Sequence, residues 1–263
     1  MTVSQADKAK KLRALHEAPG AFVIPNPWDA GSARVLEALG FQALATSSGA
    51  KAGVLGKRDG RVTREEALAN ARLIAGAVDI PVIGDLEKGF GDTPDAAALT
   101  IRGAADAGLV GGSIEDATGN KDAPLFDLKV AAERVAAASK AAKALPFPFV
   151  LTARAENHIR GHDDLDDTVQ RLQAYADAGA DVVYAPGLRT VDAIATVCRA
   201  VDRPVNVLAR SHLTVADVVG AGAQRVSVGG SLTWVAVRAL TQAATAIRDR
   251  GDLSMLDARA PSW

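Results

Sequence analysis

The sequence predicts an α/β fold, specifically a (β/α)8 barrel of the TIM type in which residues 1–263 form a single domain. Short aliphatic runs alternate eight times with longer alanine-rich segments along the chain. Hydrophobic residues make up 48% of the 263 residues and aromatic residues only 4%, which is typical of α/β proteins with one large core. No linker or change in composition divides the chain.

Eight apolar runs are the expected strands. Strands of a parallel barrel are buried on both faces, so they read as short continuous aliphatic runs. The runs are Ala21–Pro25, Ala43–Thr46, Pro81–Gly84, Val110–Ile114, Phe149–Thr152, Asp181–Tyr184, Pro204–Val207 and Arg225–Val228.

Segments with apolar residues at three- and four-residue spacing are the expected helices between these strands. Thr63 and Thr93 are placed to cap two of them, and Gly108, Gly179 and Gly222 follow helix ends. The predicted helices are Arg64–Val78, Pro94–Ala107, Leu128–Ala144, Asp166–Ala178, Val191–Ala200 and Thr214–Ala221. A final helical region, Leu232–Arg248, either docks on the barrel or crosses to a partner subunit.

A doubly wound sheet is the alternative architecture. That fold normally has fewer strands and carries a glycine-rich phosphate-binding turn after the first one. Here the first strand runs into Asn26-Pro27-Trp28-Asp29, so the barrel is favoured.

Charge and cysteine content exclude several functional classes. Thirty Lys and Arg balance 31 Asp and Glu, so no basic field attracts nucleic acid or an anionic membrane surface. No apolar run is long enough to span a membrane, and the N-terminal residues do not resemble a signal peptide. The single cysteine, Cys198, excludes an internal disulfide and indicates a cytoplasmic protein.

Acidic residues gather where catalytic groups of a barrel belong, at the carboxyl ends of strands. Asp85 and Glu87 follow the third strand, two residues apart and therefore on one side of an extended backbone, and Glu115 ends the fourth. Hard oxygen ligands suit Mg²⁺ or Mn²⁺, and no His or Cys cluster indicates zinc. The alternative interpretation is a set of buried structural ion pairs.

Other candidates follow neighbouring strands. Arg154 ends the fifth strand and could bind a substrate carboxylate with its guanidinium fork, or could pair with Glu156 or Glu115. The segment Ser47, Ser48 and Gly49 could offer backbone N–H groups to an oxyanion, or could be an ordinary turn of small residues. Asn206, at the end of the seventh strand, is a further candidate for substrate binding.

Several polar groups are expected to be structural. His158 follows the Arg154 region and is more often a solvated loop histidine than a site residue, so a Ser-His-Asp triad has little support. The acidic run of residues 163–167 lacks the spacing of a calcium loop and indicates a helix start. Cys198 is expected to pack as a small apolar side chain.

The segments NPWDAGSARVLEALGF, ATSSGAKAGVLGKRDG, GDLEKGFGD, GGSIED and LTARAEN resemble the isocitrate lyase/phosphoenolpyruvate mutase superfamily, in order and spacing, over most of the chain. The resemblance implies a modified barrel that is a homotetramer, a dimer of dimers with a C-terminal helix exchanged between subunits. It also implies Mg²⁺ and a small 2-keto or enolate acid as substrate.

Site roles follow from the same resemblance. Asp85, Glu87 and Glu115 would hold the metal, mostly through water. Arg154 and the segment Ser47, Ser48 and Gly49 would bind the substrate carboxylate and the enolate oxygen, and Asp59 would lie near the reacting group.

Departures from the family pattern narrow the chemistry. The stretch after Glu115 reads DATGNKDAPLFDL, without the cysteine and histidine of the isocitrate and methylisocitrate lyases. Lys121 matches a catalytic lysine of the phosphonate enzymes, but Ala123 stands where those enzymes have asparagine. We therefore expect a carbon–carbon lyase or decarboxylase acting on an oxaloacetate-like acid. The alternatives are P–C bond chemistry, as in phosphoenolpyruvate mutase or phosphonopyruvate hydrolase, and a non-catalytic barrel that binds carboxylates.

Overall fold

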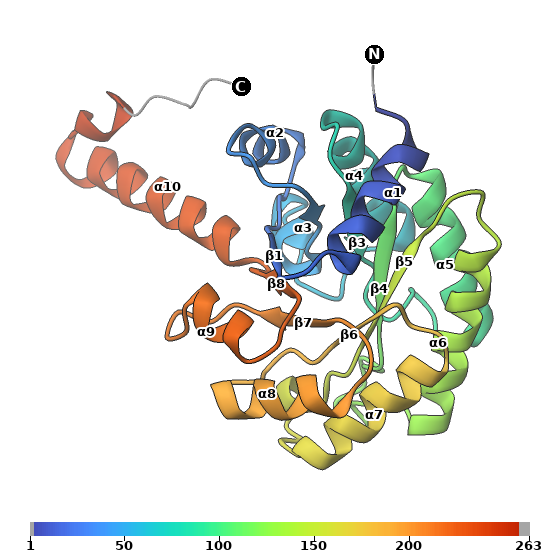
Figure 1. Cartoon of the computed structure of the whole chain (residues 1–263). Coiled ribbons are helices and arrows are strands. Elements are labelled where there is room, and N and C mark those ends of the chain that lie inside the picture. The colour runs from blue at the N-terminus through green and yellow to red at the C-terminus, as the bar shows by residue number, and fades with distance from the viewer. Residues whose placement is uncertain (1–2, 258–263) are drawn as a thin grey trace.

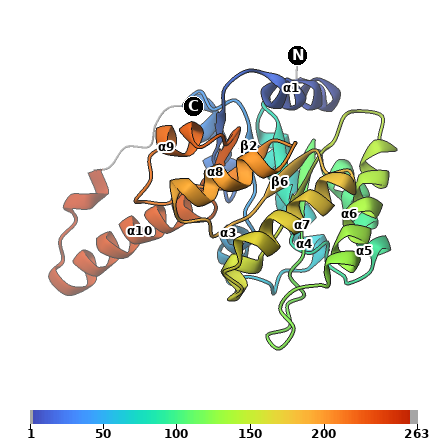
Figure 2. The same cartoon turned by 60° about the horizontal axis from the view of Figure 1, so that its bottom comes forward.

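The structure is a computed structural model that describes residues 3–257. Eight parallel strands form one sheet in the order β1-β8-β7-β6-β5-β4-β3-β2, which curls into a nearly closed barrel with helices around it (Figures 1 and 2). The predicted TIM-type fold is therefore confirmed. The strands are β1 (Phe22–Ile24), β2 (Leu44–Ala45), β3 (Val82–Asp85), β4 (Gly111–Glu115), β5 (Val150–Arg154), β6 (Val182–Tyr184), β7 (Val205–Leu208) and β8 (Arg225–Ser227).

Polar contacts join the two ends of the sheet between β1 and β2. The Ala45 N–H donates to the Pro25 carbonyl at 3.0 Å, and the Asn26 amide donates to the Thr46 carbonyl at 2.9 Å. The Asn26 oxygen accepts from the Val228 N–H at 3.1 Å. One asparagine thus links β1, β2 and β8 at the edge of the candidate site.

Alanine-rich helices surround the sheet. They are α1 (Gln5–Glu17), α2 (Ala30–Ala38), α3 (Ser48–Val54), α4 (Arg64–Ala77), α5 (Pro94–Asp106), α6 (Leu128–Lys143), α7 (Leu165–Asp177), α8 (Val191–Ala200), α9 (Val215–Gly220) and α10 (Ser231–Arg250), with short 3₁₀ segments at Asn157–Arg160 and Ser254–Asp257. The predicted caps are present. Thr63 forms a capping box with Glu66, and Thr93 caps α5 ahead of a proline in its first turn.

Two short helices, α2 and α3, were not predicted, and α3 carries the site candidates Ser48 and Gly49. Asp29 begins α2 through a reciprocal capping box with Ser32, and Ser47 begins α3 by accepting from the Ala50 N–H. The Ser47–Gly49 segment was interpreted as a possible turn of small residues, and it is instead the start of α3. For α2 the Asp-x-x-Ser pattern of Asp29 and Ser32 was an available signal.

The core has two main parts on opposite sides of the sheet, and a third small cluster of Ala52, Val62 and Ala67. The larger lies between strands and outer helices, and the smaller lies inside the barrel, where Leu12 of α1 packs against Ile24, Val110 and Val150. Because α1 closes that end with apolar side chains, the opposite mouth is left for polar groups. The last helix, α10, extends away from the barrel (Figure 1).

Candidate active site

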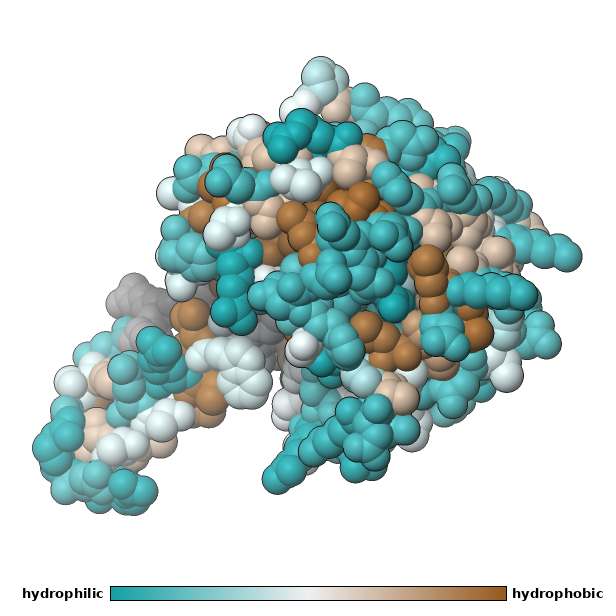
Figure 3. Space-filling view, turned by 90° about the horizontal axis from the view of Figure 1, so that it is seen from below, coloured by the Kyte–Doolittle hydropathy of each residue, from teal (hydrophilic) through white to brown (hydrophobic). Residues whose placement is uncertain are grey.

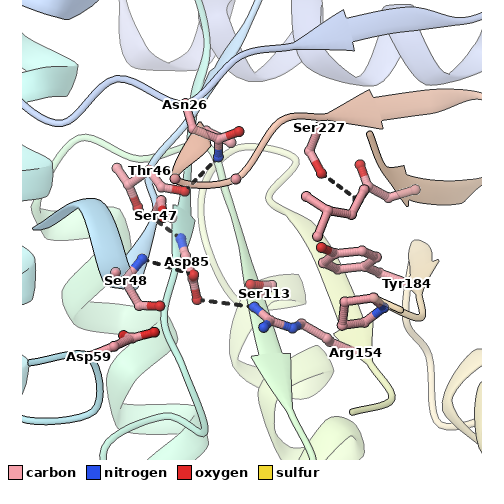
Figure 4. A pocket seen from close by; sticks show the side chains of 18 of the residues that line it. Asn26, Thr46, Ser47, Ser48, Asp59, Asp85, Ser113, Arg154, Tyr184 and Ser227 are labelled. Atoms are coloured by element: carbon pink, nitrogen blue, oxygen red, sulfur yellow. Dashed lines mark hydrogen bonds and ion pairs between the residues drawn. The ribbon is translucent and has the colours of Figure 1, made fainter. Parts of the chain in front are cut away.

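A cavity of about 620 Å³ opens at the carboxyl ends of the strands. Residues from β1 to β8 line it, together with the loop that carries Lys57, Arg58 and Asp59. Figure 4 shows Ser47, Ser48, Asp59 and Asp85 on one side of this cavity, facing Arg154. The structure thus brings most of the sequence-predicted residues into one site: Asp59, Ser47, Ser48, Gly49, Asp85, Arg154 and Asn206 all line it.

The segment after β2 supports Asp85 directly. The Ser48 N–H donates to Asp85 Oδ2 at 3.0 Å, and the Thr46 hydroxyl accepts from the Asp85 N–H at 2.9 Å. A Cβ atom added to Gly49 would lie 3.4 Å from Asp59 Oδ2, so glycine lets Asp59 approach this turn. One of the N–H groups expected to face an oxyanion is therefore already used to orient a carboxylate.

Asp85 and Glu87 diverge after β3. Glu87 has φ of 51°, in the left-handed region that glutamate seldom adopts, so the backbone is not extended here as expected. Glu87 lines a separate hollow of about 390 Å³, and its Oε1 lies 3.6 Å from the buried Lys51 ammonium. The two acids thus flank the loop instead of pointing into one cavity.

Different surroundings move the pKa values of these two acids in opposite directions. Burial raises the pKa of Asp85, but the charges of Arg154 and Lys51 and two backbone N–H donors outweigh it and leave that pKa below its usual value. Burial raises the pKa of Glu87, and Lys51 only partly opposes this. Asp85 is therefore the acid that is held ionised.

Arg154 is the centre of an ion-pair cluster. Its Nη1 lies 3.6 Å from Asp85 Oδ1 and 3.4 Å from Glu115 Oε2, and its Nε donates to the buried Glu156. Arg160 adds a second guanidinium, 2.9 Å from Glu156 Oε2 and 3.6 Å from Glu115 Oε1. Three carboxylates therefore surround Arg154. It pairs with Glu156 and Glu115, as one interpretation of the sequence expected, and it also lines the cavity, where it could contact a substrate.

The pKa of the Glu115 carboxyl is raised strongly by its place in this cluster. Burial raises its pKa to about 8, with Glu156 and Asp85 adding to the rise while Arg154 and Arg160 oppose it. It does not line the large cavity but a small enclosed space behind Arg154. Its contact with the site runs through the guanidinium.

Behind this cluster lies a network that the sequence did not predict. Asp116 Oδ1 accepts from the Glu156 N–H at 2.8 Å, and its Oδ2 accepts from the Tyr175 hydroxyl at 2.6 Å and from Arg171 at 3.1 Å. Through this chain α7 holds the turn that carries Glu156. Asp116 directly follows the end of β4, but its partners Glu156, Arg171 and Tyr175 lie 40, 55 and 59 residues away in the sequence.

A buried arginine occupies the β7–β8 side. Arg225 donates to Asn206 Oδ1 at 2.8 Å and to the Thr152 hydroxyl at 2.9 Å, and its third contact is His16 Nε2 at 3.3 Å. Asn206 in turn donates to the Ser227 hydroxyl at 3.0 Å. Burial lowers the pKa of Arg225 to about 10, and among residues 3–257 no carboxylate forms an ion pair with it. Sequence reasoning missed Arg225 because it begins a strand instead of ending one.

The remaining candidates lie outside the cavity. Lys121 is exposed on the loop between β4 and α6 and is not among the lining residues, so its catalytic role stays a prediction. His158 contacts Asp163 and the Thr168 hydroxyl, which makes it structural. Asp164 caps α7, which confirms the helix start.

The acids fit a partly hydrated Mg²⁺ better than a fully protein-coordinated ion. No three His, Cys, Asp or Glu side chains between residues 3 and 257 are close enough to enclose a metal. Mg²⁺ usually keeps several waters and takes only one or two carboxylates. Asp85 offers such an ionised oxygen in the cavity, and Glu87 Oε1 is buried without a hydrogen-bond donor.

This chain is similar in sequence and in structure to several known proteins. A family model described as phosphoenolpyruvate phosphomutase matches residues 12–248. A lyase/mutase candidate from Burkholderia cenocepacia J2315 is 51% identical with a TM-score of 0.95, covering 98% of this chain and 93% of that one. The 2-methylisocitrate lyase of Bacillus subtilis is 30% identical over 193 residues, 71% of this chain and 62% of that enzyme.

Two ligand-bound structures are similar over nearly the whole chain. Oxaloacetate acetylhydrolase in complex with its product oxalate is 25% identical with a TM-score of 0.88, covering 98% of this chain and 91% of that one. Phosphonopyruvate hydrolase in complex with oxalate and Mg²⁺ is 27% identical with a TM-score of 0.87, covering 100% of this chain and 92% of that one.

Proposed function

This chain belongs to the phosphoenolpyruvate phosphomutase family, within the isocitrate lyase/PEP mutase superfamily, and from this premise we propose that it is a Mg²⁺-dependent carbon–carbon lyase or decarboxylase. Its substrate is a small 2-keto or 2-hydroxy carboxylic acid, resembling oxaloacetate, that reacts through an enolate. The observation that carries the proposal is the facing pair of Asp85, held ionised, and Arg154 in the cavity.

The metal residues in this proposal are Asp85, Glu87 and Glu115. Asp85 would hold the ion, because it alone of the three lines the large cavity, and Glu87 and Glu115 would act through water. When bound, Mg²⁺ withdraws electron density from a 2-keto group and so favours the enolate. Mn²⁺ would serve the same purpose.

The chain's own residues orient the substrate. Arg154 binds the carboxylate next to the keto group, and its fixed position against Glu156 limits the loss of side-chain freedom on binding. The turn of Ser47, Ser48 and Gly49 stabilises developing negative charge with its hydroxyls and remaining N–H groups. Asn206 is held by Arg225 with its amide nitrogen towards Ser227, which fixes its donor direction.

Two residues are proposed to act near the reacting carbon. Asp59 lines the cavity beside Gly49 and is the nearest carboxylate to this turn that is not already accepting from Ser48. Lys121 would need its loop to close over the cavity. Because the loop offers no cysteine or histidine as a proton donor, decarboxylation, in which solvent can protonate the enolate, is favoured over cleavage by a loop acid.

Phosphonate chemistry is the second candidate. It is supported by the family model's description and by the likeness to phosphonopyruvate hydrolase. The replacement of an expected asparagine by Ala123 weighs against it.

The last helix supports an assembly proposal. In α10, Trp234, Val235 and Leu240 are 59%, 65% and 68% exposed, and the helix stands apart from the barrel in the space-filling view (Figure 3). Exposed apolar side chains on a protruding helix are stabilised when a second subunit covers them. We therefore place this chain in a homotetramer, a dimer of dimers with exchanged α10 helices.

In residues 3–257 no helix is both long and apolar enough to cross a lipid bilayer.

The test is an NMR screen of the purified full chain with Mg²⁺. The panel contains oxaloacetate, 2-methylisocitrate, isocitrate, phosphonopyruvate and phosphoenolpyruvate, followed by ¹H and ³¹P signals, with Asp85→Ala as the blank. Pyruvate formed from oxaloacetate above the blank is the expected result. A shifted phosphorus signal would support the phosphonate reaction instead, and ligand binding without turnover of any acid would support a non-catalytic barrel.

A further inference from the structure

Lys51, on α3, is a buried cation that the proposed reaction does not use. Only 2% of its side chain is exposed, and it is not among the residues that line the cavity. A second buried lysine, Lys8, donates to the Ala75 and Val78 carbonyls at the end of α4, an ordinary role for a lysine at a helix end. Lys51 has a different partner. Its ammonium lies 3.6 Å from Glu87 Oε1, its one ion pair within residues 3–257.

The strained turn after β3 places two side chains against this ammonium. Glu87 and Phe90 have φ of 51° and 54°, and among residues 3–257 they are the only non-glycine residues with a positive φ. Glu87 forms the ion pair, and the centroid of the Phe90 ring lies 5.6 Å from Lys51 Nζ. Strained backbone persists only where its surroundings enforce it, and it gathers at functional sites. The turn therefore closes around the charge of Lys51.

The backbone of this turn is also fixed from its other side, by groups that do not contact Lys51. Arg134 of α6 is buried, and its Nη1 donates to the Gly91 carbonyl at 3.0 Å. The buried Thr100 hydroxyl of α5 donates to the Gly89 carbonyl at 2.7 Å. Because these bonds hold the main chain, the loss of the Lys51 charge alone should leave the turn in place. The main effect of Lys51 on this turn is therefore electrostatic.

The charge of Lys51 acts on both acids that follow β3. After Arg154, it is the second positive charge that holds the pKa of Asp85 below its usual value, and it opposes the rise in the pKa of Glu87. Glu87 also lines a hollow of about 390 Å³, and 15% of its side chain is exposed, so water can solvate its charge as well. Lys51 thus compensates negative charge that would otherwise attract a divalent cation to this part of the barrel.

We infer that Lys51 is a positioning residue that acts as a resident cation: it holds the Glu87 carboxylate away from the cavity, neutralises it, and so sets a low affinity for the divalent cation at Asp85. This inference rests on the proposed function, which assigns the cation to that carboxylate. A fixed positive charge beside the site repels an arriving divalent cation and cancels part of the attraction of the acids. An uncharged side chain at this position should therefore give a tighter cation site.

A Mn²⁺ titration followed by electron paramagnetic resonance tests the inference on the full chain without substrate, at about pH 8. Lys51→Met keeps an unbranched side chain of similar length without the charge, and it should bind Mn²⁺ about tenfold more tightly than the unaltered chain. Glu87→Gln should bind Mn²⁺ about tenfold more weakly, for the opposite reason. The double variant, Lys51→Met with Glu87→Gln, restores the charge balance and should lie within about threefold of the unaltered chain.

The matched control is Lys10→Met, the same substitution on α1 at the opposite end of the barrel, where the side chain is 72% exposed; its Kd for Mn²⁺ should not change. Circular dichroism checks the fold of each variant, and Lys51→Gln, which should also bind more tightly, replaces Lys51→Met if that variant does not fold.

Three outcomes decide between the inference and the proposed function. Equal or weaker Mn²⁺ binding by a folded, uncharged Lys51 variant would overturn the inference and leave the proposed function standing. A gain in affinity that persists in full in the double variant would also overturn it, because Glu87 would then not be the group on which Lys51 acts. If neither the unaltered chain nor Lys51→Met binds Mn²⁺, even with oxalate, the proposed function itself fails.

Discussion

The two sides of the barrel mouth differ in how the charges of their arginine side chains are compensated. On the β3–β5 side, Arg154 and Arg160 are fixed among Asp85, Glu115 and Glu156 before any ligand arrives. On the β7–β8 side, Arg210 and Arg225 have no carboxylate among the described residues. The first side is a preorganised electrostatic framework, whereas on the second side no carboxylate of the described residues compensates the positive charge.

The largest expected effect is on the compensated side. Asp85→Asn removes the ionised oxygen proposed to bind Mg²⁺ while keeping an acceptor for the Ser48 N–H. We expect activity with Mg²⁺ to fall by at least about 10³-fold, because several kcal/mol of charge stabilisation are lost. Steady-state pyruvate formation measures this, with the exposed Asp92→Asn as a control that should retain full activity. Full activity in Asp85→Asn would refute the metal assignment.

Glu156→Gln tests whether the ion pairs around Arg154 and Arg160 also stabilise the folded protein. Glu156 is buried and contacts both arginines, so removing its charge should lower the free energy of unfolding by roughly 2–4 kcal/mol. The pKa of Glu115 should also fall, because the Glu156 charge helps to raise it. Urea unfolding and ¹³C-carboxyl NMR measure the two effects. An unaltered Glu115 titration would show that these acids do not interact.

His16→Gln probes the uncompensated side through pH. Burial, and then the Arg225 charge, lower the pKa of His16 from 6.5 to about 4. The unfolded chain therefore binds more protons than the folded one between these values, and the free energy of unfolding decreases as pH falls through this window. The unaltered protein should lose about 1–3 kcal/mol more than His16→Gln between pH 7 and pH 4.5 in urea unfolding. Parallel stability curves would show that His16 is not coupled to folding.

Cys198→Ser is the substitution expected to have the smallest effect on activity. Burial raises the pKa of the Cys198 thiol to about 11, so it stays protonated and unreactive within α8, and it is not among the residues that line the cavity. We expect kcat and KM to stay within about twofold, since surface or peripheral changes of this size rarely perturb a site. A large loss of turnover would show that α8 communicates with the cavity.

The contrast between the two sides also explains what could be predicted from sequence. Asp85, Glu115 and Arg154 were found because each ends a strand, and the position of a strand end follows from its aliphatic run. Arg225 was missed because it begins a strand, and Arg210 because nothing in the sequence distinguishes a loop arginine with a partner from one without. The eight strands and the predicted helices were confirmed, including the six-residue α9, whereas α2 and α3 were not predicted.

The backbone conformation after β3 was a second feature that could not be predicted from the sequence. Two-residue spacing placed Asp85 and Glu87 on one side, which holds for an extended strand. The positive φ of Glu87 turns it towards Lys51, and no sequence rule predicts such a φ for glutamate. Tertiary partners such as Asp116 with Tyr175 depend on contacts between distant segments and were equally out of reach.

The most direct test of the account is the binding of Mn²⁺ with and without oxalate, measured by water-proton relaxation on the full chain, Asp85→Asn and Arg210→Gln. The account predicts that the unaltered chain and Arg210→Gln form the same ternary complex, and that Asp85→Asn does not. Equal ternary complex formation by Asp85→Asn would contradict it, because the metal would then not depend on the β3–β5 side of the barrel.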